Sequence, residues 1–335
     1  MAILKPPAIE EQERKRFKIL CGNSNPLLVS KICRELGIEP VKALVGAFSD
    51  GETRVEIEEN IRGSHIFIIQ SACPPVNHNF MELCIMIDAA RRASARDVTA
   101  VVPYYGYGRQ DRKGEPRTPI SSRLAADLLI KAGMNRLIVL DLHAGQIEGC
   151  FDNLHPLNHI YIRPVFLSDI KAHFPDLSSF TFVSPDAGGV ARTRAYARRL
   201  ACPVAHIDKR REKTNEVEVI NIIGDVKERN IIIIDDIVDT CGTLKRSAEA
   251  LKRADALKIW CYITHPVLSG NALENIEASA IEKLIVSNSI PLSEQTLLCS
   301  KIRTLGVEKL LALTMLNVFR DESVSEMLES FEDYI

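Results

Sequence analysis

The residues best suited to chemistry lie in the segment NIIIIDDIVDTCGT, residues 230–243, where four isoleucines lead into three carboxylates and a turn of small residues. In open α/β sheets ligands collect at the carboxyl ends of the strands, so we expect Asp235 and Asp236 at the exit of a buried strand. The turn DTCGT precedes a helical pattern, and backbone N–H groups at a helix N-terminus favour an anion such as phosphate. Carboxylates beside an anion site suit a sugar phosphate, because they accept hydrogen bonds from its vicinal hydroxyls.

Two other interpretations of this segment stay open on these residues alone. A buried strand followed by a cluster of helix-capping residues would need no ligand. A helix with the spacing DDxxD would place its carboxylates on one face and bind a Mg²⁺-diphosphate. Four consecutive β-branched residues disfavour that helix.

Short β-rich runs alternate with helical patterns along the chain, for example HIFIIQS (65–71) before NFMELCIMIDAARRA (79–93). Continuous apolar runs are typical of strands that helices bury on both faces. The alternation predicts an α/β protein with two doubly wound, mostly parallel sheets of about five strands each. We place the domain boundary near residues 156–167, interpret KLLALTM (309–315) as a late strand, and expect a terminal helix capped by Ser323 with Glu326.

The composition is that of an ordinary globular protein: 335 residues, 46% hydrophobic and 26% charged, with a formal net charge of −2. We expect no nucleic-acid partner, because such binding needs a basic surplus. We also expect no membrane association, since no apolar run reaches the roughly 18 residues of a membrane span. Residues 1–15 read as a polar tail.

Nine cysteines without a C-x-x-C pair indicate reduced thiols in a cytoplasmic protein.

Two loops carry groups that suit a nucleotide. FSDGE (48–52) offers Asp50 and Glu52, which can accept bonds from an adenine amino group or merely hold the shape of a D-G turn. YYGYGRQDR (104–112) offers the forks of Arg109 and Arg112 for phosphates and the Gln110 amide for a base, although a solvated charged loop explains them equally well. Neither segment is a P-loop or a dinucleotide fingerprint.

Three further segments place polar residues after predicted strands. LDLHAGQIEG (140–149) carries His143, and a lone histidine is more often structural than a ligand. VSPDAGG (183–189) carries Asp186, an oxygen donor of the kind that Mg²⁺ prefers beside substrate phosphates. IDKRREKTNEVEV (207–219) is either a solvated hairpin or a mobile loop whose Lys209 and Arg211 close over a nucleotide and offset developing charge.

The acidic segment DDIVDTCGT is similar to the phosphoribosyl-pyrophosphate-binding loop of the type I phosphoribosyltransferase fold. From about residue 17 to residue 328 the chain resembles ribose-phosphate pyrophosphokinases, in particular their phosphate-regulated class I. The matching segments occur in the family's order: FSDGETRVEIEENIRGSHIFIIQS, VVPYYGYGRQDRK, LDLHAGQIEGCFD, VSPDAGGV, IDKRREKTNEVEVINIIGDV, the acidic segment, THPVLSGNA and NSIPLS.

This resemblance implies transfer of the β,γ-diphosphoryl group of Mg-ATP to the anomeric hydroxyl of ribose 5-phosphate, giving phosphoribosyl pyrophosphate and AMP. It implies two phosphoribosyltransferase-like domains, residues 16–165 and 166–317, after the tail of residues 1–15, with a C-terminal helix 318–335 packing on the first. It further implies a homo-oligomer, hexameric in class I, whose active site near the domain interface is completed by a neighbouring subunit.

The resemblance also assigns roles to matching positions. Lys209 and Arg211 stabilise the transition state. ATP contacts fall on Phe48, Asp50, Gly51, Glu52, Arg109, Gln110 and His143, and metal contacts on His143 and Asp186. Ribose 5-phosphate contacts fall on Arg211, Asp235, Asp236, Asp239, Thr240, Cys241, Gly242 and Thr243, and Cys241 stands where many bacterial members have glycine.

Two other functions stay open. A non-catalytic regulatory subunit of a synthetase complex would resemble the enzyme but carry insertions around the catalytic loop, and KRREKTNEVEV shows none. A phosphoribosyltransferase that consumes the same diphosphate would need one such domain rather than two, without the FSDGE and GYGRQD loops.

Overall fold

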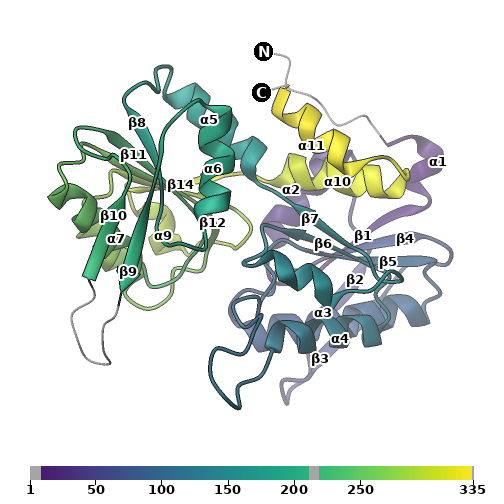
Figure 1. Ribbon diagram of the computed structural model, residues 1–335. Coiled ribbons are helices and arrows are strands. Elements are labelled where there is room, and N and C mark those ends of the chain that lie inside the picture. The colour runs from purple at the N-terminus through teal and green to yellow at the C-terminus, as the bar shows by residue number, and fades with distance from the viewer. Residues whose placement is uncertain (1–8, 211–218, 334–335) are drawn as a thin grey trace. The chain divides into compact units, whose positions relative to one another are not determined.

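The computed structural model describes residues 9–210 and 219–333 (Figure 1). It divides into two compact units. Unit 1 comprises the chain up to Pro164 together with Ser289–Pro291 and the segment from Gly306 onward; unit 2 comprises Val165–Asn288 and Leu292–Leu305. The chain therefore returns to unit 1 twice after leaving it at residue 164.

The elements of unit 1 are α1 (Glu11–Arg14), β1 (Phe17–Cys21), α2 (Pro26–Leu36), β2 (Ala43–Ala47), β3 (Thr53–Ile57), β4 (His65–Ile69), α3 (Val76–Arg92), β5 (Asp97–Val102), α4 (Ser121–Ala132), β6 (Arg136–Leu140), the 3₁₀ helix η1 (Gly145–Cys150), β7 (Leu157–Ile160), α10 (Glu308–Phe319) and α11 (Val324–Asp333). Helix α5 (Arg163–His173) begins at the boundary. Unit 2 continues with β8 (Phe180–Ser184), α6 (Val190–Arg199), β9 (Val204–Arg210), β10 (Val219–Ile223), β11 (Asn230–Val238), α7 (Gly242–Arg253), β12 (Ile259–Pro266), α8 (Ala272–Glu277), β13 (Lys283–Ser287), α9 (Glu294–Leu298) and β14 (Ile302–Leu305).

The main sheet of unit 1 has five parallel strands in the order β1-β4-β5-β6-β7. In Figure 1, α3 and α4 lie along one face and α2 and α10 along the other. Leu83 and Ile87 of α3 pack in one cluster with Ile66 and Ile68 of β4. Burial by helices on both faces is the physical reason that these strands are continuous apolar runs.

The sheet of unit 2 has seven strands in the order β10-β9-β8-β11-β12-β13-β14, all parallel except the pairing of β10 with β9. Leu244 and Ala248 of α7 pack with Ile231 and Ile233 of β11 on one face. Phe166 of α5 contacts the rings of Tyr196 and Tyr262 on the other face. The predicted α/β class with two doubly wound, mostly parallel sheets is confirmed.

A separate two-stranded antiparallel sheet, β2 with β3, belongs to unit 1. Its partly buried residues Val45 and Val55 pair with each other and pack against the core of that unit. Strand β3 also runs beside α3. The turn between the two strands contains the FSDGE segment.

Three expectations about the chain were wrong. The predicted late strand KLLALTM is part of helix α10, in which all residues from Leu310 to Leu316 are buried. Such a mostly apolar run looks the same in a buried strand and in a buried helix. Residues 306–317 also group with unit 1 rather than with the second domain, because α10 packs against α2 and Phe319 contacts Phe17. Unit 2 has seven strands instead of about five, since β10 and the short β14 extend its edges.

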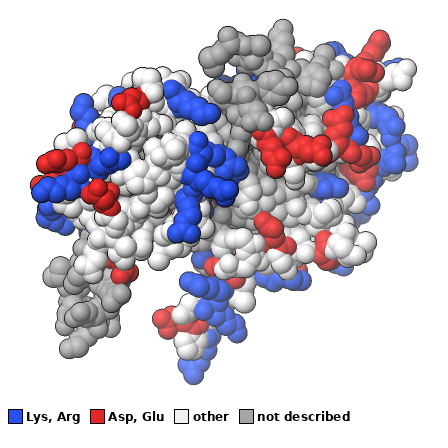
Figure 2. Space-filling view, turned by 45° about the horizontal axis from the view of Figure 1, so that its top comes forward, with Lys and Arg blue, Asp and Glu red and all other residues white. Residues whose placement is uncertain are grey.

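No helix in the described ranges is long and apolar enough to cross a lipid bilayer. All nine cysteines are free thiols. On the face drawn in Figure 2, basic and acidic side chains both occur on each unit, consistent with the small net charge.

Candidate functional site

The acidic segment lies at the carboxyl edge of the sheet of unit 2. Strand β11 pairs with β8 from Asn230 to Ile233 only, whereas its pairing with β12 continues to Val238. Asp235 and Asp236 therefore lie in the last part of β11, beyond the point where β8 has ended, and the strand continues for two residues past them to Val238. The extended conformation also shows that the helical DDxxD interpretation was wrong.

Arg192 of α6 holds the two adjacent carboxylates. One of its guanidinium nitrogens lies 2.7 Å from Oδ1 of Asp236 and 3.3 Å from Oδ1 of Asp235. The backbone N–H of Asp236 donates to Asp235 Oδ1 at 2.9 Å. Asp236 is buried, with 4% of its surface exposed, and Asp235 is partly buried. The positive charge of Arg192 compensates the two carboxylates. Without it, their like charges would repel each other strongly, because water solvates this site poorly.

The ionisation of this pair is perturbed. Burial raises the pKa of Asp235 well above its ordinary value, and the neighbouring Asp236 carboxylate raises it further. Arg192 opposes the shift, while Asp186 adds to it. The carboxylate of Asp186 therefore lies close enough to that of Asp235 for the two to interact electrostatically.

The turn between β11 and α7 is fixed by two side chains from the β12–α8 region. The Ser269 hydroxyl donates a short hydrogen bond to Asp239 Oδ1, and Asn275 Nδ2 donates to the Thr240 carbonyl at 2.9 Å. Thr240 and Thr243 are exposed, and Gly242 is the first residue of α7. The first backbone N–H groups of a helix have no partner within it, so this turn presents donors that suit an anion.

Cys241 occupies the helix N-cap with φ +60°, in the left-handed region. Glycine adopts that conformation without strain, whereas cysteine carries a small conformational cost there. Burial raises the pKa of the Cys241 thiol to about 12, with Asp239 contributing to the shift. The thiol is therefore a packing group rather than a nucleophile.

Asp186 follows β8 at the same edge. Its Oδ1 accepts a hydrogen bond from the Gly189 N–H at 2.8 Å, and its carbonyl oxygen accepts one from Ser184 Oγ at 2.7 Å. The residue is exposed. An accessible carboxylate held by a short loop fits Mg²⁺, which uses few protein ligands and keeps waters or substrate phosphates in its other positions. The described residues contain no group of three or more His, Cys, Asp or Glu side chains that could together hold a metal ion.

The segment predicted as the catalytic loop, residues 207–219, begins inside β9, so Lys209 lies in a strand and not in a loop as expected. The backbone of Lys209 lies in this strand and pairs with Ile220 of β10. Strand β9 lies next to β8 in the sheet. Lys209 is therefore on the strand adjacent to the one that carries Ser184 and leads into the loop of Asp186. Arg211 lies outside the described residues.

In unit 1, the FSDGE turn joins β2 to β3. Phe48 is 52% exposed, and the guanidinium of Arg54 lies 5.8 Å from the centre of its ring. Asp50 Oδ1 accepts a hydrogen bond from the Glu52 N–H at 3.1 Å, and Gly51 has φ +93°. Asp50 thus shapes the turn, while the ring of Phe48 stays available for stacking.

Arg109, Gln110 and His143 follow the neighbouring parallel strands β5 and β6 of unit 1, so they lie at one edge of that sheet. All three are exposed. Gln110 is tied to the start of α4, because its carbonyl accepts from the Ser122 N–H at 3.2 Å and its side chain accepts from Ser121 Oγ. A short hydrogen bond from Gln146 to Asp111 joins the two loops. The imidazole of His143 is a nitrogen donor, which suits a phosphate oxygen better than Mg²⁺.

The structure thus brings Asp186, Asp235, Asp236 and the 239–243 turn to one edge of unit 2, and Arg109, Gln110 and His143 to one edge of unit 1. The sequence analysis missed Arg192, Ser269 and Asn275, which hold the acidic groups in place. The signal for Arg192 was its position in the first turn of a helix directly after the Gly-Gly of VSPDAGG. No local sequence pattern identifies Ser269 or Asn275, because their hydrogen-bond partners lie 30 and 35 residues away in the chain.

Two family models match separate parts of the chain. Residues 17–133 match the family model described as the N-terminal domain of ribose phosphate pyrophosphokinase, and residues 209–329 match the phosphoribosyl synthetase-associated domain. The ribose-phosphate pyrophosphokinase of Burkholderia pseudomallei (strain K96243) is 49% identical over 92% of this chain and 96% of its own length. That of Helicobacter pylori (strain 26695) is 46% identical over 93% and 96%.

A solved structure is also similar. The crystal structure of phosphoribosylpyrophosphate synthetase from Mycobacterium smegmatis superposes with a TM-score of 0.86 at 34% identity, covering 91% of this chain and 99% of that one. The similarity in both sequence and structure extends over more than nine-tenths of this chain. The chain belongs to the ribose-phosphate pyrophosphokinase family.

Proposed function

We propose that this protein transfers the β,γ-diphosphoryl group of Mg-ATP to the anomeric hydroxyl of ribose 5-phosphate, giving phosphoribosyl pyrophosphate and AMP. The observation that carries this function is the edge of unit 2, where an acidic strand end adjoins a helix N-terminus. Carboxylates and an anion site side by side match a sugar that bears both hydroxyls and a phosphate. Membership of the ribose-phosphate pyrophosphokinase family supports the same reaction.

The sugar phosphate would bind across this edge. Asp235, Asp236 and Asp239 accept hydrogen bonds from the ribose hydroxyls, and the backbone N–H groups of residues 240–243 bind the 5-phosphate. The guanidinium of Arg192 offsets part of the negative charge near the incoming phosphate. Without that compensation, three carboxylates would repel a phosphate dianion.

The nucleotide would bind through the loops of unit 1. The exposed ring of Phe48 stacks on the adenine, Glu52 accepts from its amino group, and Arg109, Gln110 and His143 contact the nucleotide. Asp186 would hold Mg²⁺, which supplies charge neutralisation on the phosphate oxygens when it is bound. The ribose hydroxyl attacks the β-phosphorus of ATP and AMP leaves, while Lys209 and Arg211 offset the developing negative charge.

We infer that the enzyme works in the cytoplasm, because its nine cysteines are all free thiols. We further propose a homo-oligomer, a hexamer by family resemblance, with no nucleic-acid partner. The formal net charge of −2 supports the last point, as does the mixture of acidic and basic side chains on the face drawn in Figure 2.

The decisive experiment incubates the purified protein with Mg-ATP and ribose 5-phosphate and measures AMP and phosphoribosyl pyrophosphate by chromatography. Equal amounts of both products are expected. A regulatory subunit would form neither product alone but would change the rate of an active synthetase added to it. A phosphoribosyltransferase would consume phosphoribosyl pyrophosphate together with a nucleobase. Either of these results would overturn the proposed function.

A further inference from the structure

A fully buried carboxylate lies in unit 1. Glu82 of α3 has none of its surface exposed. Its Oε1 accepts hydrogen bonds from the Asn23 N–H at 2.8 Å and from Gln70 Nε2 at 2.6 Å. Its Oε2 accepts from Asn23 Nδ2 at 2.8 Å, and His78 Nε2 lies 3.9 Å away. Burial of a carboxylate costs free energy unless hydrogen bonds compensate it. A buried carboxylate that accepts three close hydrogen bonds therefore points to a specific structural role.

The donors to Glu82 come from the carboxyl ends of two adjacent strands, β1 and β4. Gln70 directly follows β4; its Oε1 accepts from the Ser24 N–H at 2.9 Å, while Ser24 Oγ accepts from the Ser71 N–H at 2.8 Å. A Cβ atom on Gly22 would stand 2.2 Å from Gln70 Oε1, so only glycine leaves room for this bridge. The loop of residues 22–24 is consequently bound to α3 and to the segment after β4.

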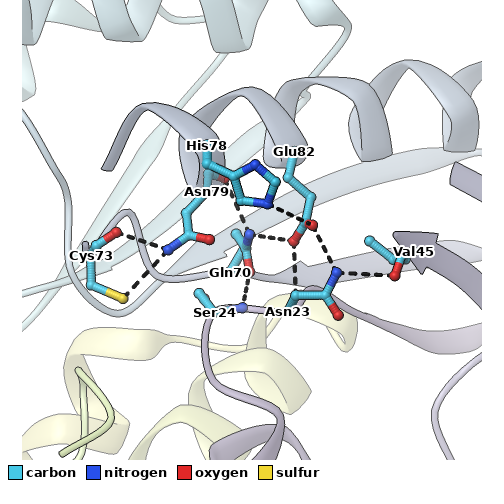
Figure 3. A network of polar contacts seen from close by, with 8 residues as sticks. All are labelled: Asn23, Ser24, Val45, Gln70, Cys73, His78, Asn79 and Glu82. Atoms are coloured by element: carbon cyan, nitrogen blue, oxygen red, sulfur yellow. Dashed lines mark hydrogen bonds and ion pairs between the residues drawn. The ribbon is translucent and has the colours of Figure 1, made fainter. Parts of the chain in front are cut away.

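Asn23 extends this network to the β2–β3 hairpin. Its Nδ2 donates both to Glu82 Oε2 and to the carbonyl oxygen of Val45 in β2, the latter at 3.0 Å (Figure 3). A two-stranded hairpin is marginally stable by itself and depends on its attachments. Val45 is three residues before Phe48, a separation of about 10 Å along a strand. The amide of Asn23 thus connects a rigid buried carboxylate to the strand that leads into the FSDGE turn.

We propose that Glu82 and Asn23 are positioning residues for the nucleotide: they fix the hairpin so that the FSDGE turn presents its ring and carboxylate to the adenine. This inference rests on the proposed function, in which that turn contacts ATP. Neither residue contacts ATP under this proposal. Their loss therefore weakens nucleotide binding through the hairpin and leaves the ribose phosphate site of unit 2 unchanged.

The test compares Asn23→Ala with wild type and with Asn60→Ala. Asn23→Ala removes the bonds from Nδ2 to Glu82 and Val45 but keeps the backbone N–H bond to Glu82. Asn60 is an exposed asparagine of the same unit whose side chain accepts from the Arg62 N–H two residues on, so it controls for loss of an amide. Asn23→Ala is expected to raise the KM for ATP about fivefold to tenfold, the effect of a hydrogen bond worth about 1 kcal/mol. We expect kcat and the KM for ribose 5-phosphate to stay within about twofold of wild type.

Two further measurements do not depend on turnover. Calorimetric titration with Mg-ATP alone should show the same loss of affinity. Hydrogen exchange should become faster at the backbone amides of residues 43–57 and stay unchanged in the central strand β5. Glu82→Gln should act in the same direction and more strongly, because an amide NH₂ then faces the donors of Asn23 or Gln70.

A KM for ATP equal to that of wild type in Asn23→Ala would overturn the inference, as would an equal rise of both KM values. If Glu82→Gln does not fold, Asn23→Ala decides the question alone. If the wild-type protein forms no AMP, the proposed function fails separately. The hydrogen-exchange and ATP-titration results then decide whether Asn23 fixes a nucleotide-binding hairpin.

Discussion

One guanidinium nitrogen of Arg192 lies 2.7 Å from Oδ1 of Asp236, although the two residues are 44 positions apart in the chain. The same nitrogen reaches Asp235 at 3.3 Å, so one cation serves two adjacent carboxylates. Helix α6 and strand β11 are packed against each other, which brings the three residues to the same sheet edge. The arrangement lets carboxylates face a phosphorylated sugar without an unbalanced local charge.

Arg192→Ala should weaken ribose 5-phosphate binding and destabilise unit 2. It leaves two adjacent carboxylates, one of them buried, without their cation, and we expect a loss of about 2 kcal/mol in the free energy of unfolding. The KM for ribose 5-phosphate should rise about tenfold or more, because an uncompensated acidic pair repels the phosphate. Urea denaturation and steady-state kinetics measure the two effects. Arg194→Ala, an exposed arginine on the same helix, is the control and should change neither quantity appreciably.

Lys209→Ala should lower kcat by about 10²-fold or more while the fold survives, since removal of a donor that stabilises developing charge typically has that effect. The measurement is AMP formation at saturating concentrations of both substrates. Lys227→Ala is a matched control in the same unit, because Lys227 is an exposed lysine lying 4.0 Å from Asp255. Turnover of Lys209→Ala close to that of wild type would refute the catalytic role.

Asp239→Asn should raise the KM for ribose 5-phosphate by about tenfold and leave the KM for ATP within about twofold, because a charged acceptor of a hydroxyl is replaced by an amide. Ser269→Ala separates binding from loop geometry, since it removes the donor to Asp239 but keeps the carboxylate. We expect a smaller effect from Ser269→Ala. An equal rise of both KM values in Asp239→Asn would contradict the assignment of this loop to the sugar.

Glu13 and Arg320 form an ion pair whose contribution to the stability of the fold depends on pH. Two hydrogen bonds of 2.8 and 2.9 Å join them, and hydrogen bonding to Arg320 lowers the pKa of Glu13 from 4.5 to about 2. A lowered pKa in the folded state stabilises the fold at a pH above the unfolded value, and this contribution is lost as the pH falls from 4.5 towards 2.

Glu13→Gln should therefore lower the free energy of unfolding at pH 7 by about 1 kcal/mol, a value reduced for partial solvent exposure of the pair. Urea denaturation between pH 7 and pH 3.5 measures this difference, which should shrink below pH 4.5. Glu11→Gln in the same short helix controls for the loss of one negative charge. If the difference in the free energy of unfolding stays constant over the whole pH range, the Glu13–Arg320 ion pair is not its cause.

The amino-acid sequence determined the features that depend on neighbouring residues. Four β-branched residues in a row disfavour a helix, so the acidic segment had to end a strand, and β11 confirms this. The small residues of DTCGT allow a tight turn into α7, which predicted a helix N-terminus beside the carboxylates. Alternation of apolar runs with amphipathic patterns predicted two doubly wound sheets.

Only the tertiary structure decided which distant side chains meet. Arg192 finds its carboxylates 43 and 44 residues away, and Glu82 finds Asn23 at a separation of 59 residues. No local spacing encodes such pairs, because they exist only once strands and helices have packed. The same reason explains the error at residues 309–315: a run of apolar residues indicates burial, but whether it is buried as a strand or a helix depends on the surface that it meets.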